Sequence, residues 1–86
     1  MKLKEEFITR TIDGTQFIVS RGGTAFDGIV RNNETAALIV DLLKDGAARD
    51  EIVDKLFAAY DAPREVIAKD VDGVLDKLRS IGAIEE

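Results

Sequence analysis

Gly28-Ile-Val-Arg-Asn-Asn-Glu-Thr-Ala-Ala37 is the stretch that decides how this chain folds. The part from Gly28 to Asn32 is rich in strand formers. The next part predicts the start of a helix, because the side-chain oxygen of Asn33 can accept a bond from a free backbone N–H, and Glu34 places a negative charge in the first turn. We therefore expect strands before this stretch, helices after it, and a third strand that leaves the sheet with a free edge.

The residues before this stretch predict a β-hairpin of two strands, over residues 5–12 and 15–20. Asp13-Gly14 favours a two-residue type I′ turn, because both central residues of that turn need a positive φ angle. This turn pairs Ile12 with Thr15 and sets the register. One face then collects apolar residues around one charged residue, and the other face is mixed. The first face holds Ile8, Arg10, Ile12, Phe17 and Val19, and the second holds Phe7, Thr9, Thr11, Gln16 and Ile18.

Apolar residues recur at helical spacing over residues 34–44, 49–59 and 63–81, which predicts three amphipathic helices. Gly46 and Gly82 are expected to end the first and third helices, because glycine readily adopts the left-handed conformation that follows a helix. The three expected core stripes are Ala36, Ile39, Val40 and Leu43; then Ile52, Val53, Leu56, Phe57 and Tyr60; then Ile67, Val71, Val74, Leu75 and Leu78.

The second and third helices differ in how well the residue at the predicted N-terminus suits a helix start. Pro63 suits a first helical position. Ala48 offers no side-chain acceptor to the second helix, although Glu51 stands where a capping-box glutamate would. The order of elements predicts one α+β domain over residues 1–86, a three-stranded antiparallel sheet followed by three helices, similar to a winged helix-turn-helix.

Composition excludes several classes of protein. The 86 residues contain no cysteine and no histidine, so a disulfide frame and a thiolate metal site are excluded. The apolar runs are too short for a membrane span, and the N-terminus lacks an apolar signal core. Residues 1–32 carry five basic and four acidic side chains, whereas residues 33–86 carry seven basic and thirteen acidic ones. We expect a cytoplasmic protein without metal or cofactor that binds neither membrane nor nucleic acid.

Catalysis is not expected either. Asp70 and Asp76 lie among basic residues at a spacing that suits surface ion pairs. No serine has a general base beside it in the sequence. The cluster Asp50-Glu51-Asp54 lacks the alternating loop spacing of a calcium site and is typical of an exposed helix face.

Five motifs in a fixed order resemble the PqqD family, the small proteins of pyrroloquinoline quinone biosynthesis. They are Gly28 to Leu43, Glu51-Ile-Val53, Tyr60-Asp61, Lys69-Asp-Val71, and Leu75-Asp-Lys-Leu78 with Gly82 after it. The resemblance covers nearly the whole chain, and residues 28–84 most fully. Asn32, Val40 and Ala48 depart from the leucine, tryptophan and threonine common in the family, which suggests a relative of the quinone protein and leaves its pathway open.

The resemblance implies a peptide-binding function. Domains of this family, also called RiPP recognition elements, bind the leader segment of a ribosomally made precursor peptide and present it to a modifying enzyme, often a radical SAM enzyme. The leader is expected to add as a strand beside the third strand, in a groove closed by the third helix. Carried over to this chain, the peptide-binding residues are Gly28, Ile29, Val30, Arg31 and Asn32 on the strand, and Ile67, Asp70, Val74 and Lys77 on the helix.

Two other functions fit the same order of elements. The first is a winged-helix nucleic-acid-binding or regulatory domain, but DNA affinity depends on phosphate neutralisation by basic side chains, and acidic residues offset the basic ones on the third helix. The second is a structural or dimerisation domain without a ligand. We expect a monomer or a weak dimer, because a free sheet edge can pair with itself. On the third helix, Glu65, Asp70, Asp72 and Asp76 stand against Lys69, Lys77 and Arg79.

Overall fold

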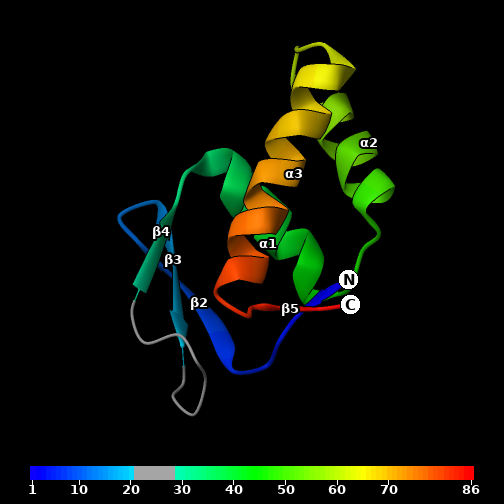
Figure 1. The fold of residues 1–86 in the computed structure, drawn as a ribbon. Coiled ribbons are helices and arrows are strands. Elements are labelled where there is room, and N and C mark those ends of the chain that lie inside the picture. Colours follow the sequence, from blue (N-terminus) through cyan, green and yellow to red (C-terminus); the bar gives the residue numbers. More distant parts are fainter. Residues whose placement is uncertain (21–28) are drawn as a thin grey trace.

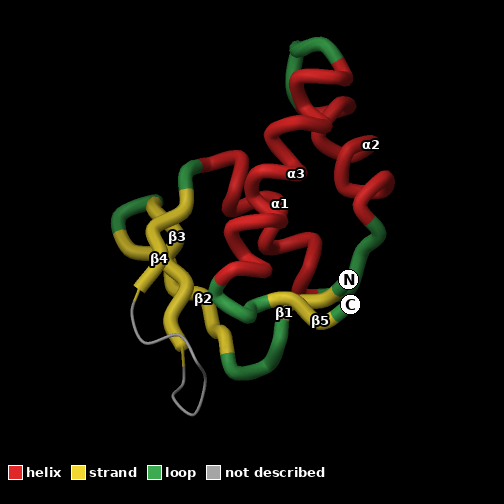
Figure 2. The backbone as a smooth tube through the Cα atoms, in the orientation of Figure 1, coloured by secondary structure: helices red, strands yellow, loops and turns green. Residues whose placement is uncertain are grey.

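The computed structural model describes residues 1–20 and 29–86, in which a three-stranded sheet precedes three helices (Figure 1). The elements are β1 (Lys2–Leu3), β2 (Phe7–Ile12), β3 (Thr15–Ser20), β4 (Ile29–Asn32), α1 (Glu34–Lys44), α2 (Arg49–Ala59), α3 (Arg64–Ser80) and β5 (Ile84–Glu85). The sheet is antiparallel in the order β2-β3-β4, and β1 pairs with β5 in a separate ribbon (Figure 2). The expected α+β fold is confirmed, and so are the bounds of α1 and α2.

The β2–β3 hairpin has the predicted register, with Ile12 opposite Thr15. Asp13 and Gly14 have φ angles of 52° and 79°, which are the positive values that a type I′ turn requires. β2 begins at Phe7, two residues later than expected, because residues 4–7 form a turn in which the N–H of Phe7 donates to the carbonyl of Lys4. β4 runs antiparallel to β3 with Asn32 opposite Gln16, so β2 and β4 are the two edge strands of this sheet.

The mixed face of the hairpin packs against the helices, and the more apolar face does not. Phe7, Ile18 and Val30 are 3%, 0% and 8% exposed and form the inner face of the sheet. Ile12 and Ile29, on the outer face, are 58% and 67% exposed. The more apolar pattern therefore does not identify the core side of this hairpin.

Two arginines on the outer face of the sheet explain why this face is exposed to solvent and not packed against the helices. Phe17 lies opposite Arg10 on β2 and opposite Arg31 on β4, so both guanidinium groups share its face. Burying two unpaired guanidinium groups would cost more free energy than exposing a few apolar side chains. The sheet therefore presents this face to solvent.

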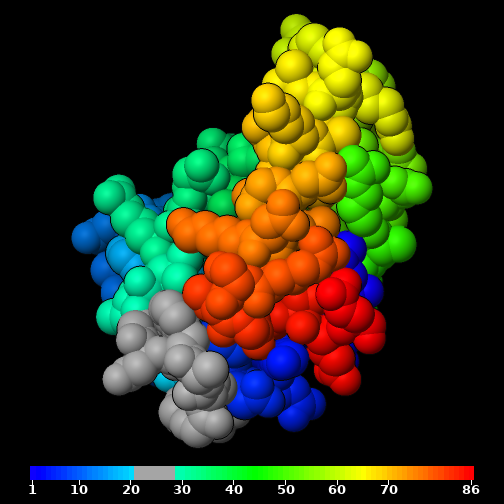
Figure 3. All heavy atoms as spheres, in the orientation of Figure 1, coloured from blue at the N-terminus to red at the C-terminus, as the bar shows by residue number. Residues whose placement is uncertain are grey.

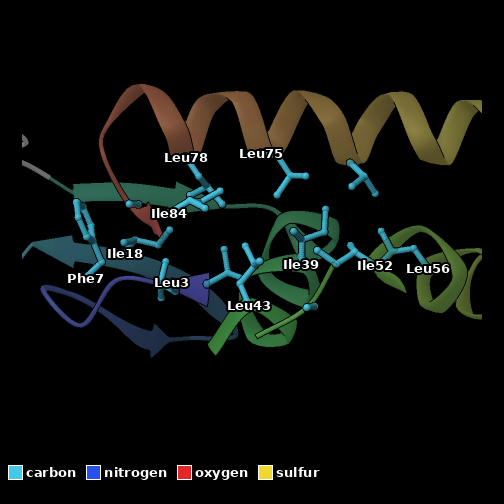
Figure 4. Packing of buried hydrophobic residues seen from close by; sticks show 14 of the residues in the cluster. Leu3, Phe7, Ile18, Ile39, Leu43, Ile52, Leu56, Leu75, Leu78 and Ile84 are labelled. Atoms are coloured by element: carbon cyan, nitrogen blue, oxygen red, sulfur yellow. The ribbon is translucent and has the colours of Figure 1, made fainter. Parts of the chain in front are cut away.

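The core lies between the inner face of the sheet and the three helices (Figure 4). α2 packs along α3, and α1 contacts β3, β4 and α3. Three members of the predicted stripes are less buried than expected: Phe57 is 45% exposed, and Tyr60 and Val74 are half-buried. Phe57 lies at the border of the α2–α3 contact, where the guanidinium carbon of Arg64 is 5.4 Å from the centre of its ring. The labelled core residues in Figure 4 are Leu3, Phe7, Ile18, Ile39, Leu43, Ile52, Leu56, Leu75, Leu78 and Ile84.

The end of α3 is a Schellman motif, as the glycine predicted. Gly82 has a φ angle of 73° and donates to the carbonyl of Arg79 at 3.0 Å, while the N–H of Ala83 donates to the carbonyl of Leu78 at 2.9 Å. At the other end, Pro63 is the cap residue rather than the first helical residue, because its carbonyl already accepts the first bonds of the helix. The reversal after α3 returns the chain to the core.

The β1–β5 ribbon was not predicted. Leu3 lies opposite Ile84, and both side chains are buried. The N–H of Lys4 donates to the carbonyl of Ala83 at 2.8 Å, which extends the ribbon by one bond. The ribbon brings the first and last described residues side by side (Figure 2). None of the helices in the described ranges is long and apolar enough to cross a membrane.

Candidate functional site

A groove with a volume of about 460 Å³ lies between β4 and α3. Figure 3 shows this face of the molecule, where the surface of β4 (green-cyan) lies next to the surface of the second half of α3 (orange). β4 leads through Asn33 directly into α1, so the first turn of α1 closes one end of the groove. Asn33 is the N-cap of α1 at this end of the groove, because its side-chain oxygen accepts a hydrogen bond from the N–H of Ala36 at 2.8 Å.

Six of the nine residues proposed from the sequence line this one groove. They are Val30, Arg31 and Asn32 from β4, and Asp70, Val74 and Lys77 from α3. Ile67 is buried in the core and lines a smaller hollow beside the groove, together with Tyr60. Ile29 points to the outer face of the sheet, and Gly28 lies outside the described residues.

Four residues that were not proposed from the sequence also line the α3 side of the groove: Lys69, Gly73, Leu78 and Ile81. Lys69 and Gly73 line it together with the proposed Asp70, Val74 and Lys77. Residues three and four positions apart share a helix face, so the spacing that selected Asp70, Val74 and Lys77 also predicts Gly73 between them and Lys69 one turn earlier.

The register fixes which backbone groups of β4 face the open edge. In a two-residue hairpin the residues that flank the turn exchange both of their backbone bonds, and such pairs alternate along the ladder. The backbone groups of Gln16 and Ile18 therefore point toward β4, where they meet Asn32 and Val30. The N–H and C=O groups of Ile29 and Arg31 consequently point away from β3, toward the open edge of the sheet.

Among the described residues, the backbone N–H and C=O groups of Ile29 and Arg31 have no partner strand, and Arg31 lines the groove. An edge of this kind can template a further strand. β2 is also an edge strand, but it lies at the opposite side of the sheet from α3. The edge of β4 therefore borders the side-chain groove that it forms with α3.

Charged groups in the groove are not paired with one another. In the described ranges, no carboxylate lies within 4 Å of the cationic groups of Arg31, Lys69 or Lys77, and no cationic group lies within 4 Å of the carboxylate of Asp70. The Arg31 side chain lies on the outer face of the sheet, so the α3 side of the groove carries two lysines against one carboxylate, a basic balance in a chain with a net charge of −5. This local excess favours an acidic ligand.

The arginines of α2 and α3, unlike the groove lysines, are matched by acids. Arg49 donates two bonds of 2.9 Å to Asp72, which lowers the pKa of the Asp72 carboxyl and raises the pKa of the guanidinium. Arg79 donates to the carboxylate of Glu86, which raises the pKa of this second guanidinium. The unpaired cations of the groove therefore contrast with neighbours on the same helices.

A polar network fixes the end of β4 from inside. The side-chain amide of Asn32 donates to Oε1 of Gln16 at 2.7 Å, and Nε2 of Gln16 donates to Asp41 on α1 at 3.0 Å. Asp41 also pairs with Lys44 at 3.0 Å. Asn32 and Gln16 are both buried, so their mutual bond satisfies polar groups that would otherwise destabilise the fold. Asn32, a departure from the family's leucine, is thereby accommodated.

A second hollow, of about 580 Å³, lies at the turn end of the sheet and shares Arg31 and Asn32 with the groove. Its other walls come from the β2–β3 turn and from α1, including Gly14 and Asp41. Among residues 1–20 and 29–86, no three Asp or Glu side chains gather in a way that could hold a metal ion.

Comparisons with known proteins agree with this fold. The family model of coenzyme PQQ synthesis protein D (PqqD) matches residues 20–84. No curated protein matches the chain significantly. The structure of TbiB1 in complex with the TbiA(beta) leader peptide is similar with a TM-score of 0.79 and 21% identity, over 99% of this chain and 100% of that one. The structure of a lasso peptide synthetase B1 complexed with the leader peptide is similar with a TM-score of 0.81 and 22% identity, over 99% and 96% of the two chains.

These two likenesses concern the fold. The family match is a match of sequence, and it spans well over half of the chain, including β4, all three helices and the groove between them. The resemblance found in the sequence motifs is thereby confirmed, and the chain belongs to the PqqD family.

Proposed function

We propose that this domain binds the leader segment of a ribosomally made precursor peptide and presents it to an enzyme that modifies the peptide. The observation that carries the proposal is the unpaired edge of β4 beside a basic groove. Membership of the PqqD family supports it, and so do the two structures of similar fold, both of which contain a leader peptide. In this proposal the domain has no catalytic activity of its own.

The proposed mode of binding is strand addition to β4. The N–H and C=O groups of Ile29 and Arg31 would exchange bonds with the peptide backbone, which gives affinity with little dependence on sequence. Peptide residues opposite Val30 and Asn32 would point into the groove, because directly opposed residues in a sheet point to the same face. Choice among peptides would then come from the groove-facing side chains.

The proposed enzyme partner is a radical SAM enzyme or another peptide-modifying enzyme. Family membership supports the first kind, and likeness to a lasso peptide synthetase B1 supports the second. We propose that binding takes place in the cytoplasm and that one copy of the domain binds one peptide. The groove is formed by a single chain, which supports this stoichiometry.

Amide hydrogen exchange tests the strand addition directly. The probe is a synthetic peptide that covers the leader segment of a precursor encoded beside the gene for this chain. In the free protein the amide of Arg31 should exchange fast and the amide of Val30 slowly, because only the latter bonds to β3. Saturation with the peptide should slow exchange at Arg31.

A control residue makes the result specific. Ile12 lies on the opposite edge strand, and its N–H already bonds to Thr15 across the turn. Its exchange should not respond to the peptide. Protection that develops along β2 instead of β4, or binding without any protection at Arg31, would contradict strand addition at this edge.

A further inference from the structure

Gly73 has no structural reason to be glycine in the free protein. It lies in the interior of α3, where glycine is the least favourable residue apart from proline. Its φ angle is not positive, and a Cβ atom added to it would meet no heavy atom within 4 Å. Neither a turn nor a close packing contact in the described chain therefore requires the missing side chain.

The space above Gly73 opens into the groove. Gly73 is part of the groove lining, and Val30 and Val74 provide apolar walls beside it. A ligand side chain placed there would contact apolar atoms and the bare helix backbone. A large apolar side chain would fill this space best, since it would bury the most apolar surface.

Two ammonium groups flank this space at equal intervals. Lys69 precedes Gly73 by four residues, and Lys77 follows it by four, so all three positions lie on one helix face. Neither lysine has an acidic partner within 4 Å among the described residues. The helix thus presents a row of cation, gap and cation along the groove.

The spacing of this row matches an extended peptide. Four residues of an α-helix advance about 6 Å along its axis. Alternate residues of a strand, which point to the same face, are about 6.7 Å apart. β4 runs along α3 (Figure 4), so a strand added to β4 would run along the same row. Its successive groove-facing residues would then meet Lys69, Gly73 and Lys77 in turn.

We infer that the groove selects a peptide segment with the pattern acidic–any–large apolar–any–acidic, with its central side chain over Gly73 and its two carboxylates beside Lys69 and Lys77. This inference rests on the proposed strand addition to β4. It adds the chemical class of the segment, which the backbone contacts alone do not specify. The pattern reads the same in both directions, so it holds for parallel and for antiparallel addition.

Three synthetic peptides with identical flanking residues test the pattern. Their central segments are Asp-Thr-Phe-Thr-Asp, Asp-Thr-Ala-Thr-Asp and Lys-Thr-Phe-Thr-Lys. The first peptide should bind about tenfold or more tightly than the second, because it buries a phenyl ring. At low salt it should also bind about tenfold more tightly than the third, and added salt should reduce that second ratio.

Substitutions at Gly73 separate binding from stability. Gly73→Ala should raise the melting temperature by about 4–8 °C, because alanine favours the helix interior. The same substitution should weaken binding of the phenylalanine peptide, and Gly73→Leu should abolish its advantage over the alanine peptide. Lys69→Glu should weaken binding of the acidic peptides, whereas Lys55→Glu, on an exposed position of α2 outside the groove, should not.

A display library of random peptides, selected on the wild-type domain, tests the sequence pattern separately from strand addition to β4. Enrichment of the pattern, with protection at Arg31, supports both. Binders that protect Arg31 but lack the pattern overturn this inference and leave the proposed function intact. Binders that leave Arg31 unprotected, or a library without any binders, overturn both. Gly73→Ala variants that bind the phenylalanine peptide as tightly as the wild type also overturn the inference.

Discussion

Single prolines in β4 should separate stability from peptide binding, and the register determines which position does which. Proline lacks an N–H and is tolerated in a sheet only where that group would face away from a partner strand. The N–H of Arg31 faces the open edge, whereas the N–H of Val30 faces Ile18 on β3. Arg31→Pro should therefore weaken peptide binding, and Val30→Pro should weaken the fold.

The magnitudes follow from one hydrogen bond in each case. A net contribution of about 0.5–1.5 kcal/mol corresponds to a loss of about 2- to 13-fold in Kd for Arg31→Pro, relative to Arg31→Ala. Its free energy of unfolding should stay within about 0.5 kcal/mol of that alanine control, since the lost group bonded only to water. Val30→Pro leaves a carbonyl of β3 without its partner and should cost about 1–3 kcal/mol more than Val30→Ala.

Urea denaturation gives the free energies of unfolding, and calorimetric titration with the leader peptide gives Kd. The alanine variants remove the contributions of the side chains, so each proline is compared with its own alanine. Two results would contradict strand addition at Arg31: a greater loss of stability in Arg31→Pro than in Val30→Pro, or binding of the peptide by Arg31→Pro as tight as that by Arg31→Ala. Either result would show that the backbone groups of Arg31 do not serve as the binding edge.

Three further predictions concern single side chains. Ala48→Thr should raise the free energy of unfolding by roughly 0.5–2 kcal/mol, because the Glu51 carboxylate already accepts from the N–H of Ala48 at 3.4 Å and only the reciprocal bond is missing; an unchanged or lower urea midpoint would count against it. Lys77→Glu should weaken binding of the leader peptide and should do so less at high salt, whereas an unchanged Kd at low salt would place Lys77 outside the contact. Arg49 lowers the pKa of Asp72, so Asp72 stabilises the fold at neutral pH and loses this contribution as the pH falls through its folded-state pKa, below about pH 4; Asp72→Asn should be less stable than the wild type at pH 7, with a gap that closes in acid, and a gap independent of pH would contradict this.

Local signals in the sequence were sufficient for most elements. The Asp13-Gly14 turn fixed the hairpin register, because its conformation permits one pairing. Asn33 and Gly82 marked helix ends because cap positions need a side-chain acceptor or a positive φ angle, and the structure has both. These features depend on neighbouring residues alone, which is why one sequence predicts them.

Features that depend on remote contacts were predicted less well. Both faces of the hairpin carry apolar residues, and the packing of the helices decides which of them is buried. Arg10 was the one charged residue on the more apolar face of the hairpin. Arg31 of β4 lies on the same face of the sheet, and two arginines on one face favour its exposure to solvent. The β1–β5 ribbon could not be predicted, because strands of two residues are too short to show an alternating pattern of apolar and polar residues. Gly73 was not proposed as a site residue, because from sequence alone an isolated glycine in a helix indicates only a position of low helix propensity.

The β1–β5 ribbon also has a consequence for the order of folding. It joins residues 2–3 to residues 84–85, so it can form only after nearly the whole chain has been closed into a loop. The entropy of closing that loop is greater than that of the short loops in the hairpin or between α2 and α3. We expect the ribbon to be unformed in the folding transition state. Leu3→Ala should then speed unfolding and leave the folding rate almost unchanged, and stopped-flow measurement of both rates would show whether the two ends of the chain join last.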